Sequence, residues 1–393
     1  MDKKINLELL DNIQFIYELA LAKLELQSFG ESLIIKNGFR EFGLKLKNDY
    51  TKIDLKKRLA YFKAVDGENT DYYELQKYNQ TKSVNQYLTH WIYPYKGKFH
   101  PQMIRALINI IGLGKGQTLL DPFVGSGTAI LEAQLLGINS IGIDISSLCV
   151  LISKVKTQSL DKIDIIKKYR NNYIHQGDLF SSRIKRKVQE EEVNNFYKIA
   201  EMIAHSDQKR RGKNFESSYY QNIDKMLLSL EDFKKAKDKL KIVLGETKVL
   251  QEDARNLKIK SNSIDGIITS PPYSIALNYV SNDSHSLQAL GYDLNKIKED
   301  FIGVRGTGFE KFDLYENDMQ KAYSEMYRVL KKNSYCVVII GNVTYDGQEV
   351  DTTQQVIDFC GKLGFKTIKK IDKIIFGLYN VMQKEYILIF QKG

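Results

Sequence analysis

The chain has 393 residues, of which 43% are hydrophobic, so it can bury a core in one large domain or in two to three domains. Its formal net charge of +10 favours a polyanionic partner, such as nucleic acid or an anionic membrane surface. No apolar run approaches the ~20 residues of a membrane span, and the first residues lack the apolar segment of a secretory signal. The scattered Cys149, Cys336 and Cys360 offer no disulfide framework, which predicts reduced thiols in a cytoplasmic protein.

Residues 1–90 are predicted to form a small N-terminal accessory region. Within it, the spacing of apolar residues over Phe15–Gly30 predicts an amphipathic helix. Leu55–Val65 is predicted to form one further element, and the polar stretch Gly67–Gln80 is expected to be a linker. The segments that carry recognisable chemistry follow this region.

The chain contains five prolines, and they are confined to three short segments. Pro94 and Pro101 flank the sequence YKGKFH, Pro122 precedes a glycine-rich loop, and Pro271 and Pro272 are adjacent. Proline fixes φ and lacks an N–H donor, so it is costly inside helices and central strands. We therefore expect the backbone shape to be prescribed at these three places.

The glycine-rich loop lies between a predicted strand and a predicted helix. Gln117–Leu120 is expected to be the strand, Asp121–Thr128 the loop and Ala129–Leu136 the helix, followed by a second strand over Ser140–Ile145. Asp144 stands at the tip of that second strand, where an acid can accept both hydroxyls of a ribose. This order is typical of the first half of a doubly wound nucleotide-binding sheet. The loop lacks G-x-G-x-x-G and a Lys-Ser/Thr pair, which disfavours dinucleotide and nucleoside triphosphate binding.

Residues 158–245 show no strand pattern and no proline, and they predict a helical insertion. The wider stretch 151–245 holds 21 Lys and Arg against 13 Asp and Glu, which accounts for most of the net charge of the chain. Its aromatic residues are interspersed with basic clusters. The insertion is therefore a candidate for gripping nucleic-acid phosphates, and a solvated helical decoration is the alternative. The cluster expected to contact phosphates comprises Lys209, Arg210, Arg211 and Lys213.

Two further strands are predicted after the insertion, and each ends in a polar motif. Lys248–Gln251 leads into Glu252-Asp253-Ala254-Arg255, and Ile264–Thr269 leads into Ser270-Pro271-Pro272-Tyr273. In a doubly wound sheet, ligands bind beyond the carboxyl ends of the strands. Asp144, Asp253 and Ser270 are therefore expected to converge beside the glycine loop.

The C-terminal part is predicted to complete a sheet of about seven strands. Met319–Leu330 and Thr352–Leu363 have helical spacing, and Gly364 ends the second of these helices. Tyr335–Ile340 is an apolar strand, and Phe365–Ile375 with Glu385–Phe390 is expected to be the terminal strand pair. The predicted fold class is α/β, with a doubly wound sheet, a helical insertion and a small N-terminal domain.

The ordered set DPFVGSGT, Asp144, EDAR and TSPPY resembles the S-adenosylmethionine-dependent amino-methyltransferases of nucleic acids. The resemblance covers about Tyr93–Thr157 and Thr247–Gly393, and it implies a Rossmann-like methyltransferase domain over 91–157 and 246–393. Upstream, KGKFHPQMIRALI resembles the family element that closes over the methionine end of the cofactor. The insertion precedes EDAR here, whereas the family often places its target-recognition segment after that position.

The resemblance implies a role for each matching residue. Ser270, Pro271, Pro272 and Tyr273 would hold the target base, with Asn278 and Tyr279 in the loop that covers it and Arg305 at a phosphate. The residues implied to bind S-adenosylmethionine are Lys98, His100, Asp121, Phe123, Gly125, Ser126, Gly127, Thr128, Asp144, Ile145, Asp253 and Ala254. Among these, Asp144 would bind the ribose and Asp253 the adenine amino group.

The expected activity is site-specific methylation of the N4 amino group of cytosine in double-stranded DNA, and a companion restriction endonuclease is an expected partner. Serine before Pro-Pro-Tyr resembles the cytosine-N4 group more than the adenine-N6 group, which stays open. An RNA substrate also stays open, because residues 1–90 weakly resemble the leading region of tRNA guanine-N2 methyltransferases. Methylation of a cytosine ring carbon is disfavoured, since it needs a cysteine nucleophile and no cysteine lies in a Pro-Cys turn. A non-enzymatic cofactor-binding subunit is the remaining alternative, and no metal site is expected.

Overall fold

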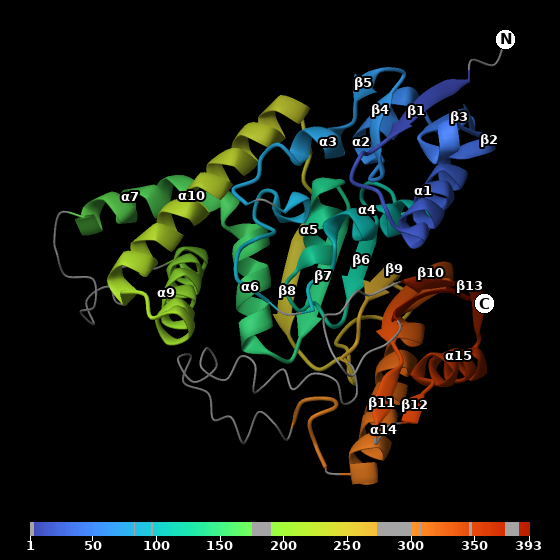
Figure 1. The fold of residues 1–393 in the computed structure, drawn as a ribbon. Helices are drawn as coiled ribbons and strands as arrows, with labels where there is room; N and C mark the ends of the chain where they lie inside the picture. Colours follow the sequence, from blue (N-terminus) through green and yellow to red (C-terminus); the bar gives the residue numbers. More distant parts are fainter. Residues whose placement is uncertain are drawn as a thin grey trace.

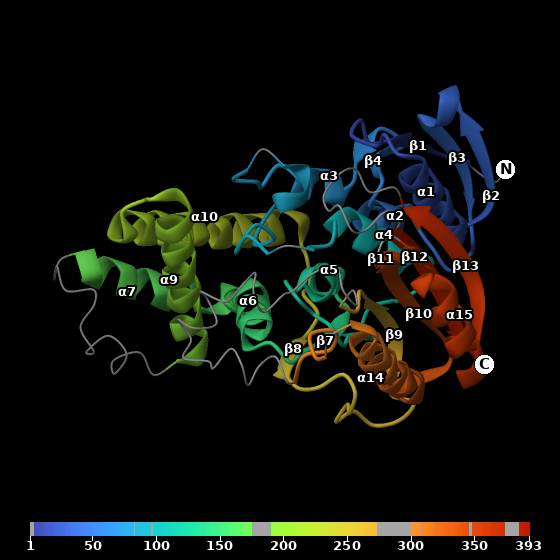
Figure 2. The same cartoon turned by 60° about the horizontal axis from the view of Figure 1, so that its bottom comes forward.

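The structure is a computed structural model. It describes residues 4–81, 83–95, 97–174, 190–272, 300–306, 308–345, 348–373 and 385–393. A central sheet with helices on both faces forms the body of the molecule (Figure 1). A smaller sheet near the N-terminus lies at one end of this body, and a group of helices projects from the other end (Figure 2).

The central sheet has seven strands in the order β13-β14-β10-β9-β6-β7-β8. Strands β8, β7, β6, β9 and β10 are mutually parallel, and β14 is antiparallel to both β10 and β13. The bounds are β6 Thr118–Asp121, β7 Asn139–Asp144, β8 Thr247–Gln251, β9 Ile264–Thr269, β10 Leu330–Gly341, β13 Phe365–Lys373 and β14 Glu385–Lys392. The chain order reverses beside β6, so the sheet is doubly wound, as predicted, with its switch point between β6 and β9.

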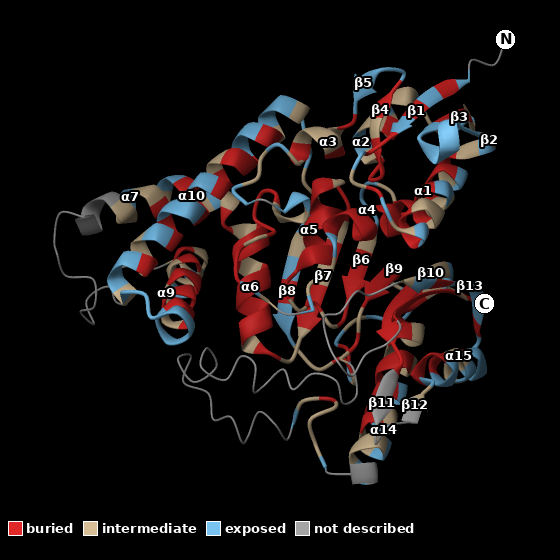
Figure 3. Cartoon of the chain, in the orientation of Figure 1, coloured by how far each residue is buried: buried red, intermediate tan, exposed pale blue. Residues whose placement is uncertain are grey.

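Helices cover both faces of the central sheet, which explains why its inner strands are largely apolar, whereas the edge strands β8 and β13 carry exposed polar residues. On β10, Val337 and Ile339 pack in the core beneath α4 (Pro101–Ile110) and α5 (Thr128–Leu135). The alternate residues Val338 and Ile340 pack beneath helices on the other face, α14 Gly308–Val329 and α15 Thr352–Leu363. Buried residues therefore fill the middle layer (Figure 3).

The N-terminal unit has the βαββαβ order of ferredoxin-like folds. Its elements are β1 Ile5–Leu9, α1 Ile16–Phe29, β2 Gly30–Lys36, β3 Glu41–Leu46, α2 Lys52–Arg58 and β4 Phe62–Val65. The strands form an antiparallel sheet in the order β2-β3-β1-β4-β5. Residues of α1 share one hydrophobic core with α4, so this unit is packed onto the central body. The helix predicted over Phe15–Gly30 is confirmed, and the assignment of residues 1–90 as an accessory region stays a prediction.

The prediction of a linker over Gly67–Gln80 is wrong. This stretch forms β5 (Glu68–Asn69) and α3 (Asp71–Leu75). The Thr70 hydroxyl accepts the Tyr73 N–H at 3.2 Å and caps the helix. Tyr72 and Leu75 are fully buried against the core. The sequence of this stretch is mostly polar, and its helix is too short to show a periodic pattern, so the two buried residues were not recognised.

The insertion is helical, as predicted. Helix α6 (Ser147–Gln158) leads through a short 3-10 turn into α7 (Ile163–Ile174), and α9 (Glu191–Arg211) and α10 (Phe215–Leu240) then form a long hairpin. Apolar residues of α9 and α10 share a core with α6, which anchors the hairpin to the edge of the sheet near β8. The hairpin turn lies towards the same side of the molecule as the carboxyl ends of β7 and β8 (Figure 1).

The predicted C-terminal elements are confirmed, and all of them except the helix over Thr352–Leu363 have changed bounds. Helix α14 begins earlier than the predicted Met319, and β10 extends beyond Tyr335–Ile340 at both ends. Strand β13 is described as far as Lys373, so the last two residues predicted for it lie outside the described ranges. A small hairpin that was not predicted consists of β11 Val343–Tyr345 and β12 Gln348–Val350. The 3-10 helices are η1 Asn37–Phe39, η2 Val84–Gln86 and η3 Leu160–Lys162.

Candidate active site

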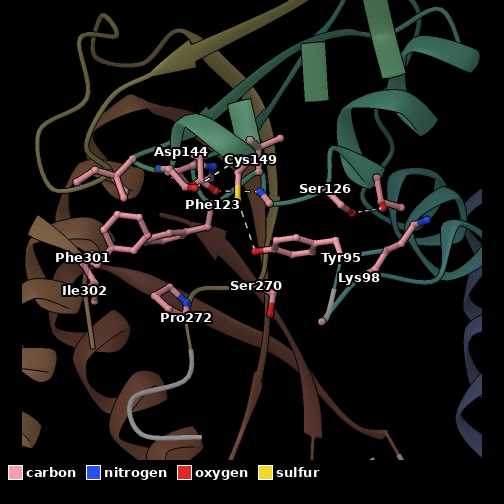
Figure 4. A pocket seen from close by; sticks show the side chains of 18 of the residues that line it. Tyr95, Lys98, Phe123, Ser126, Asp144, Cys149, Ser270, Pro272, Phe301 and Ile302 are labelled. Carbon is pink, nitrogen blue, oxygen red and sulfur yellow. Dashed lines mark hydrogen bonds between the residues drawn. The ribbon is translucent and has the colours of Figure 1, made fainter. Parts of the chain in front are cut away.

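A pocket lies beyond the carboxyl ends of β6, β7, β8 and β9, at the switch point of the sheet (Figure 4). Asp144 lies on one side of it, and Ser270 and Pro272 lie on the opposite side (Figure 4). Nine of the twelve residues expected to bind the cofactor line this pocket. They are Lys98, Phe123, Gly125, Ser126, Thr128, Asp144, Ile145, Asp253 and Ala254.

The glycine loop has a backbone that other residues do not readily adopt. Gly125 and Gly127 have φ values of 48° and 76°, in the left-handed region that favours glycine. A Cβ atom on Gly127 would lie 2.8 Å from Ser153 Oγ, so α6 packs directly against the loop. The Ser153 hydroxyl donates to the Gly125 carbonyl at 3.2 Å, and Lys156 Nζ donates to the Ser126 carbonyl at 2.8 Å. Helix α6 thus fixes the shape of the pocket floor.

Asp144 ends β7 and faces the glycine loop. Its Oδ2 accepts the Gly125 N–H at 3.0 Å, and its Oδ1 accepts the Ser146 N–H at 2.9 Å. Burial raises the pKa of this carboxyl to about 6, because the ionised form loses its hydration, although the two backbone donors partly offset this. The carboxylate is therefore held in one orientation and still lines the pocket.

Asp121, at the end of β6, links two strands beneath the pocket. Its Oδ1 accepts the Thr269 hydroxyl at 2.6 Å and the Phe123 N–H at 3.2 Å. Its buried Oδ2 has no hydrogen-bond partner among the described residues. Burial raises the pKa of the carboxyl to about 7. Asp121 thus ties the glycine loop to the strand that ends at Ser270, and it keeps one acceptor unused.

Lys98 approaches the pocket from the segment before α4. Its Nζ donates to Gln86 Oε1 at 3.0 Å and to the His90 carbonyl. Burial lowers the pKa of this ammonium to about 7, because both of these acceptors are neutral. The position favours an anionic group of a ligand, which would pair with the charged form.

Over residues 92–297, more than half of the chain, the sequence matches the family described as RMKL-like methyltransferase domain. The chain belongs to this family. Its glycine loop, Asp144, Asp253 and the Ser270–Pro272 turn all fall within the matched residues. The pocket is therefore the candidate active site of a methyltransferase domain.

Three relatives carry methyltransferase names. The chain is 27% identical over 310 residues to the type II methyltransferase M.BsoBI of Geobacillus stearothermophilus, covering 62% of this chain and 60% of that protein. It is 41% identical over 95 residues to the type II methyltransferase M.MjaII of Methanocaldococcus jannaschii, covering 24% and 18%. It is 28% identical over 167 residues to a tRNA (guanine(10)-N2)-dimethyltransferase of the same organism, covering 40% and 47%. The chain spans less than two thirds of the length of each relative.

Three residues expected at the cofactor are not among those that line the pocket of the methyltransferase domain. His100 is the exposed residue that precedes α4, and Gly127 forms the N-terminal cap of α5. Asp121 is buried beneath the pocket, where it bonds to Thr269. The proline turn does reach the pocket through Ser270 and Pro272. Tyr273, Asn278 and Tyr279 lie outside the described residues.

Three of the basic residues expected to contact nucleic acid form ion pairs within the protein. Arg305 pairs with Asp318. Arg211 Nη1 and Lys213 Nζ lie 3.0 and 2.9 Å from the two carboxylate oxygens of Asp207. Lys209 and Arg210 occupy the last turn of α9. A phosphate contact by these residues stays a prediction.

The pocket also has aromatic and apolar walls that the sequence did not point to. The Tyr95 ring lies 3.4 Å from the Cβ position of Gly125, and its hydroxyl is 3.6 Å from Cys149 Sγ. Phe301 and Ile302 line the opposite wall (Figure 4). Tyr95 follows Pro94 in the proline-flanked segment YKGKFH, so the sequence offered a signal by which Tyr95 could have been predicted at the site. Phe301 and Ile302 offered none, because no recognisable motif surrounds them.

In the described ranges, no three His, Cys, Asp or Glu side chains gather as a metal-binding group. Within the same ranges, every helix is too short or too polar to cross a bilayer. Cys149, Cys336 and Cys360 are buried thiols, as predicted.

Proposed function

We propose that this methyltransferase transfers a methyl group from S-adenosylmethionine to the N4 amino group of cytosine in duplex DNA. The observation that carries the proposal is the convergence of Asp144, Asp253 and Ser270 on one pocket. These residues lie at or just beyond the carboxyl ends of three strands of the sheet, and in doubly wound folds such strand ends hold nucleotide-like ligands. A methyl donor and a planar base thus have adjoining sites.

The chemistry of the lining residues fits S-adenosylmethionine. The Asp144 carboxylate would accept the two ribose hydroxyls, and Asp253 would accept the adenine amino group. Phe123 and Ile145 supply apolar faces for the purine ring. Lys98 suits the cofactor's carboxylate, since the acceptors that this ammonium has among the described residues are neutral. When bound, the cofactor supplies an electrophilic methyl group on a sulfonium.

The residues of the proline turn prepare the amine. The lone pair of an exocyclic amino group is delocalised into the base, so the amine is a weak nucleophile. Ser270 Oγ and the Pro271 carbonyl would accept its two protons, which favours a pyramidal nitrogen. The two prolines stiffen this turn, so that little reorganisation is needed during the reaction. Serine is too weak a base to hold the proton at neutral pH, so the proton leaves to water.

Duplex DNA is the preferred substrate, and its target base must leave the helix at a cost of a few kcal/mol. We propose cytosine as the target base because Ser270 stands where adenine enzymes more often carry aspartate. This choice rests on the family association more than on a physical difference between the two amino groups. Tyr273 would stack on the extruded base. Two of the relatives are type II methyltransferases, which also supports a DNA substrate.

Transfer RNA is the second candidate, because one relative is a tRNA guanine-N2 dimethyltransferase. The N-terminal sheet argues against it. RNA-binding sheets of this topology stack bases on aromatic side chains, whereas Phe42 and Phe62, the aromatic residues of these strands, are buried. Exposed positions of the same sheet carry ion pairs such as Lys63–Glu8 and Lys45–Glu31.

The test of the proposed function is the identity of the product. The protein is incubated with labelled S-adenosylmethionine and either unmodified duplex DNA or transfer RNA, and the digested nucleosides are separated by mass. Label in N4-methylcytosine is the expected result. Label in N6-methyladenine would overturn the base, and label only in transfer RNA would overturn the substrate class.

Neutralising Lys209, Arg210, Arg211 and Lys213 to alanine should weaken DNA binding and flatten its dependence on salt. Each lost phosphate contact lowers the slope of log affinity against log salt by about 0.9. Because Asp207 already pairs with Arg211 and Lys213, we expect Lys209 to contribute more to the change than either of these two residues. Fluorescence anisotropy over a series of salt concentrations measures the slope.

The control for this prediction is Lys225→Ala with Lys234→Ala, two exposed lysines on α10 outside the cluster. This variant loses the same type of charge from the same hairpin and should keep the wild-type slope. An unchanged slope in the four-residue variant would show that the cluster does not contact phosphates.

A further inference from the structure

Arg255, two residues after Asp253, joins three segments of the methyltransferase domain. Its Nε lies 3.0 and 2.9 Å from Asp253 Oδ1 and Oδ2, and its Nη2 lies 2.7 Å from Oδ2. Its Nη1 donates to Asp318 Oδ2 on α14 at 3.0 Å, and Nη2 also donates to the Asp300 carbonyl at 3.0 Å. One guanidinium thus fixes the end of β8 relative to α14 and to the segment at 300–306.

The same anchor holds one wall of the pocket. Phe301 and Ile302, which line the pocket, directly follow the carbonyl that Arg255 binds. Asp318 is nearly buried, at 4% side-chain exposure, and it also pairs with Arg305 from this segment. The segment is therefore tied to Arg255 at its first residue and to Asp318 near its end.

Asp253 keeps capacity for a ligand despite its contacts with Arg255. Its side chain is 34% exposed, whereas that of Arg255 is 16% exposed, and Asp253 lines the pocket. Three N–H groups of Arg255 donate to this carboxylate: the backbone N–H to Oδ1 at 2.9 Å, Nε to both oxygens and Nη2 to Oδ2. An ionised carboxylate has about four lone-pair sites, so one is left for a ligand. A donor inside the pocket can thus share the carboxylate while the guanidinium sets its direction.

We propose that Arg255 is a positioning residue that selects a cofactor bearing an amino-substituted purine. It does so by aiming the Asp253 carboxylate at the amino group and by holding the Phe301–Ile302 wall. This inference rests on the proposed function, because it assigns the adenine end of S-adenosylmethionine to this side of the pocket. Lysine cannot replace the fork, since its ammonium is a point charge that cannot bind Asp253 and Asp318 in the same geometry.

The experiment compares two ligands by calorimetric titration: S-adenosylhomocysteine, and its analogue with the purine amino group replaced by hydrogen. For the wild type, removing the amino group should weaken binding by roughly tenfold or more, as expected for a lost bond to a charged acceptor. Arg255→Lys should bind S-adenosylhomocysteine about tenfold more weakly and should discriminate between the two ligands by less than about threefold. A merely structural role would lower both affinities and leave their ratio unchanged.

Arg328→Lys is the matched control. Arg328 also forms a fork, with Glu325, and it binds the Leu257 and Ile259 carbonyls, but it does not line the pocket. This variant should keep the wild-type ratio between the two ligands. Thermal melting of each variant shows whether it is folded at the temperature of the titration.

A second variant tests the wall separately. Asp318→Asn weakens the contact with Nη1 but leaves Nε and Nη2 on Asp253, so both ligands should bind several-fold more weakly at an unchanged ratio. Wild-type discrimination in folded Arg255→Lys would overturn the positioning role, and wild-type affinity in Asp318→Asn would overturn the role of the wall. If the wild-type protein bound neither ligand, the proposed function itself would fall, and the inference with it.

Discussion

Asp144→Asn should weaken S-adenosylmethionine binding by about 100-fold without unfolding the protein. Hydrogen bonds to an ionised acceptor contribute roughly 1.5–3 kcal/mol each, and about 1.4 kcal/mol corresponds to tenfold in affinity. The carboxylate already accepts the Gly125 and Ser146 N–H groups. Each carboxylate oxygen accepts one of these N–H groups, so an asparagine NH₂ in either place faces a donor and loses that bond. The remaining amide oxygen is a neutral and therefore weaker acceptor for a ribose hydroxyl. Calorimetric titration measures the loss.

Asp265→Asn is the control for Asp144→Asn. Asp265 lies at the opposite end of the sheet, where it accepts the Thr118 N–H at 2.9 Å and pairs with Lys331 at 2.6 Å. It therefore has a comparable backbone contact without access to the pocket. We expect wild-type affinity for the cofactor in this variant. Equal affinities in Asp144→Asn and the wild type would exclude Asp144 from the cofactor site.

The same pair of proteins gives a pH test. Burial raises the pKa of Asp144 to about 6, and only the ionised carboxylate accepts from both a ribose and the backbone. As the pH falls through about 6, the ratio of wild-type to Asp144→Asn affinity should fall, by up to about tenfold per pH unit. Taking the ratio removes the titration of Lys98, whose pKa is lowered to about 7 by burial. A ratio that is constant from pH 5 to pH 8 would contradict this assignment.

The raised pKa of Asp144 also has a consequence for the free protein. In the unfolded chain this carboxyl titrates near 3.8, so between that pH and about 6 the folded state holds the extra proton. The contribution of Asp144 to the free energy of unfolding is thus fully present below pH 3.8, and it is lost as the pH rises through about 6. Below about pH 6, a ligand that needs the ionised carboxylate must also supply the free energy of deprotonating Asp144.

The parts of the fold that the sequence predicted are those with a buried periodic pattern. The strand expected over Ile264–Thr269 has those bounds in the structure, because a β-branched run covered on both faces is stopped by two prolines. The helix over Thr352–Leu363 also has its expected bounds, ending at Gly364 with a φ of 103°. In both cases a residue that ends the element in sequence, a proline or a glycine, stands where the packed strand or helix ends in the structure.

The N-terminal unit was only partly predictable, because its strands are short and lie in a sheet exposed on one face. β2 has an exposed or half-buried side chain at every position, so no alternation marks it. The order βαββαβ becomes visible only when the strands are paired. The buried residues Tyr72 and Leu75 within Gly67–Gln80 were not predicted either, because the residues that they pack against are distant in sequence.

The candidate site was predictable where a motif fixes the chemistry, and not where a distant contact builds the wall. Asp144 and Asp253 lie at strand ends, as the strand–acid pattern predicted. Phe301 and Ile302 line the pocket, and their segment is tied to Arg255 and, through Arg305, to Asp318, which itself pairs with Arg255. The pattern of the sequence does not specify that long-range ion pair. Asp121 belongs to a cofactor motif and was predicted to bind the cofactor, but it is buried beneath the pocket and accepts the Thr269 hydroxyl.

Ser270→Ala should lower kcat by roughly 100-fold and change the affinity for S-adenosylmethionine by less than about twofold. Ser270 lies opposite Asp144 in the pocket (Figure 4), so its loss leaves the ribose acceptor untouched. Removing one preorganised hydrogen-bonding group from a reacting centre typically costs about 10²–10³ in rate. Single-turnover measurement of methyl transfer at saturating DNA separates this loss from any change in binding.

Two further variants, Ser263→Ala and Ser270→Asp, test what the Ser270 hydroxyl contributes to the rate of methyl transfer. Ser263→Ala removes a hydroxyl near the other end of β9, where it donates to the Lys260 carbonyl at 2.6 Å, and it should turn over at the wild-type rate. Ser270→Asp replaces the hydroxyl with a stronger acceptor of similar reach, so it should regain much of the rate lost in Ser270→Ala. If the alanine variant is as active as the wild type, Ser270 does not orient the amine. If the aspartate variant is as slow as alanine, the hydroxyl acts as a donor to the base rather than as an acceptor, because only the hydroxyl can donate a proton at neutral pH.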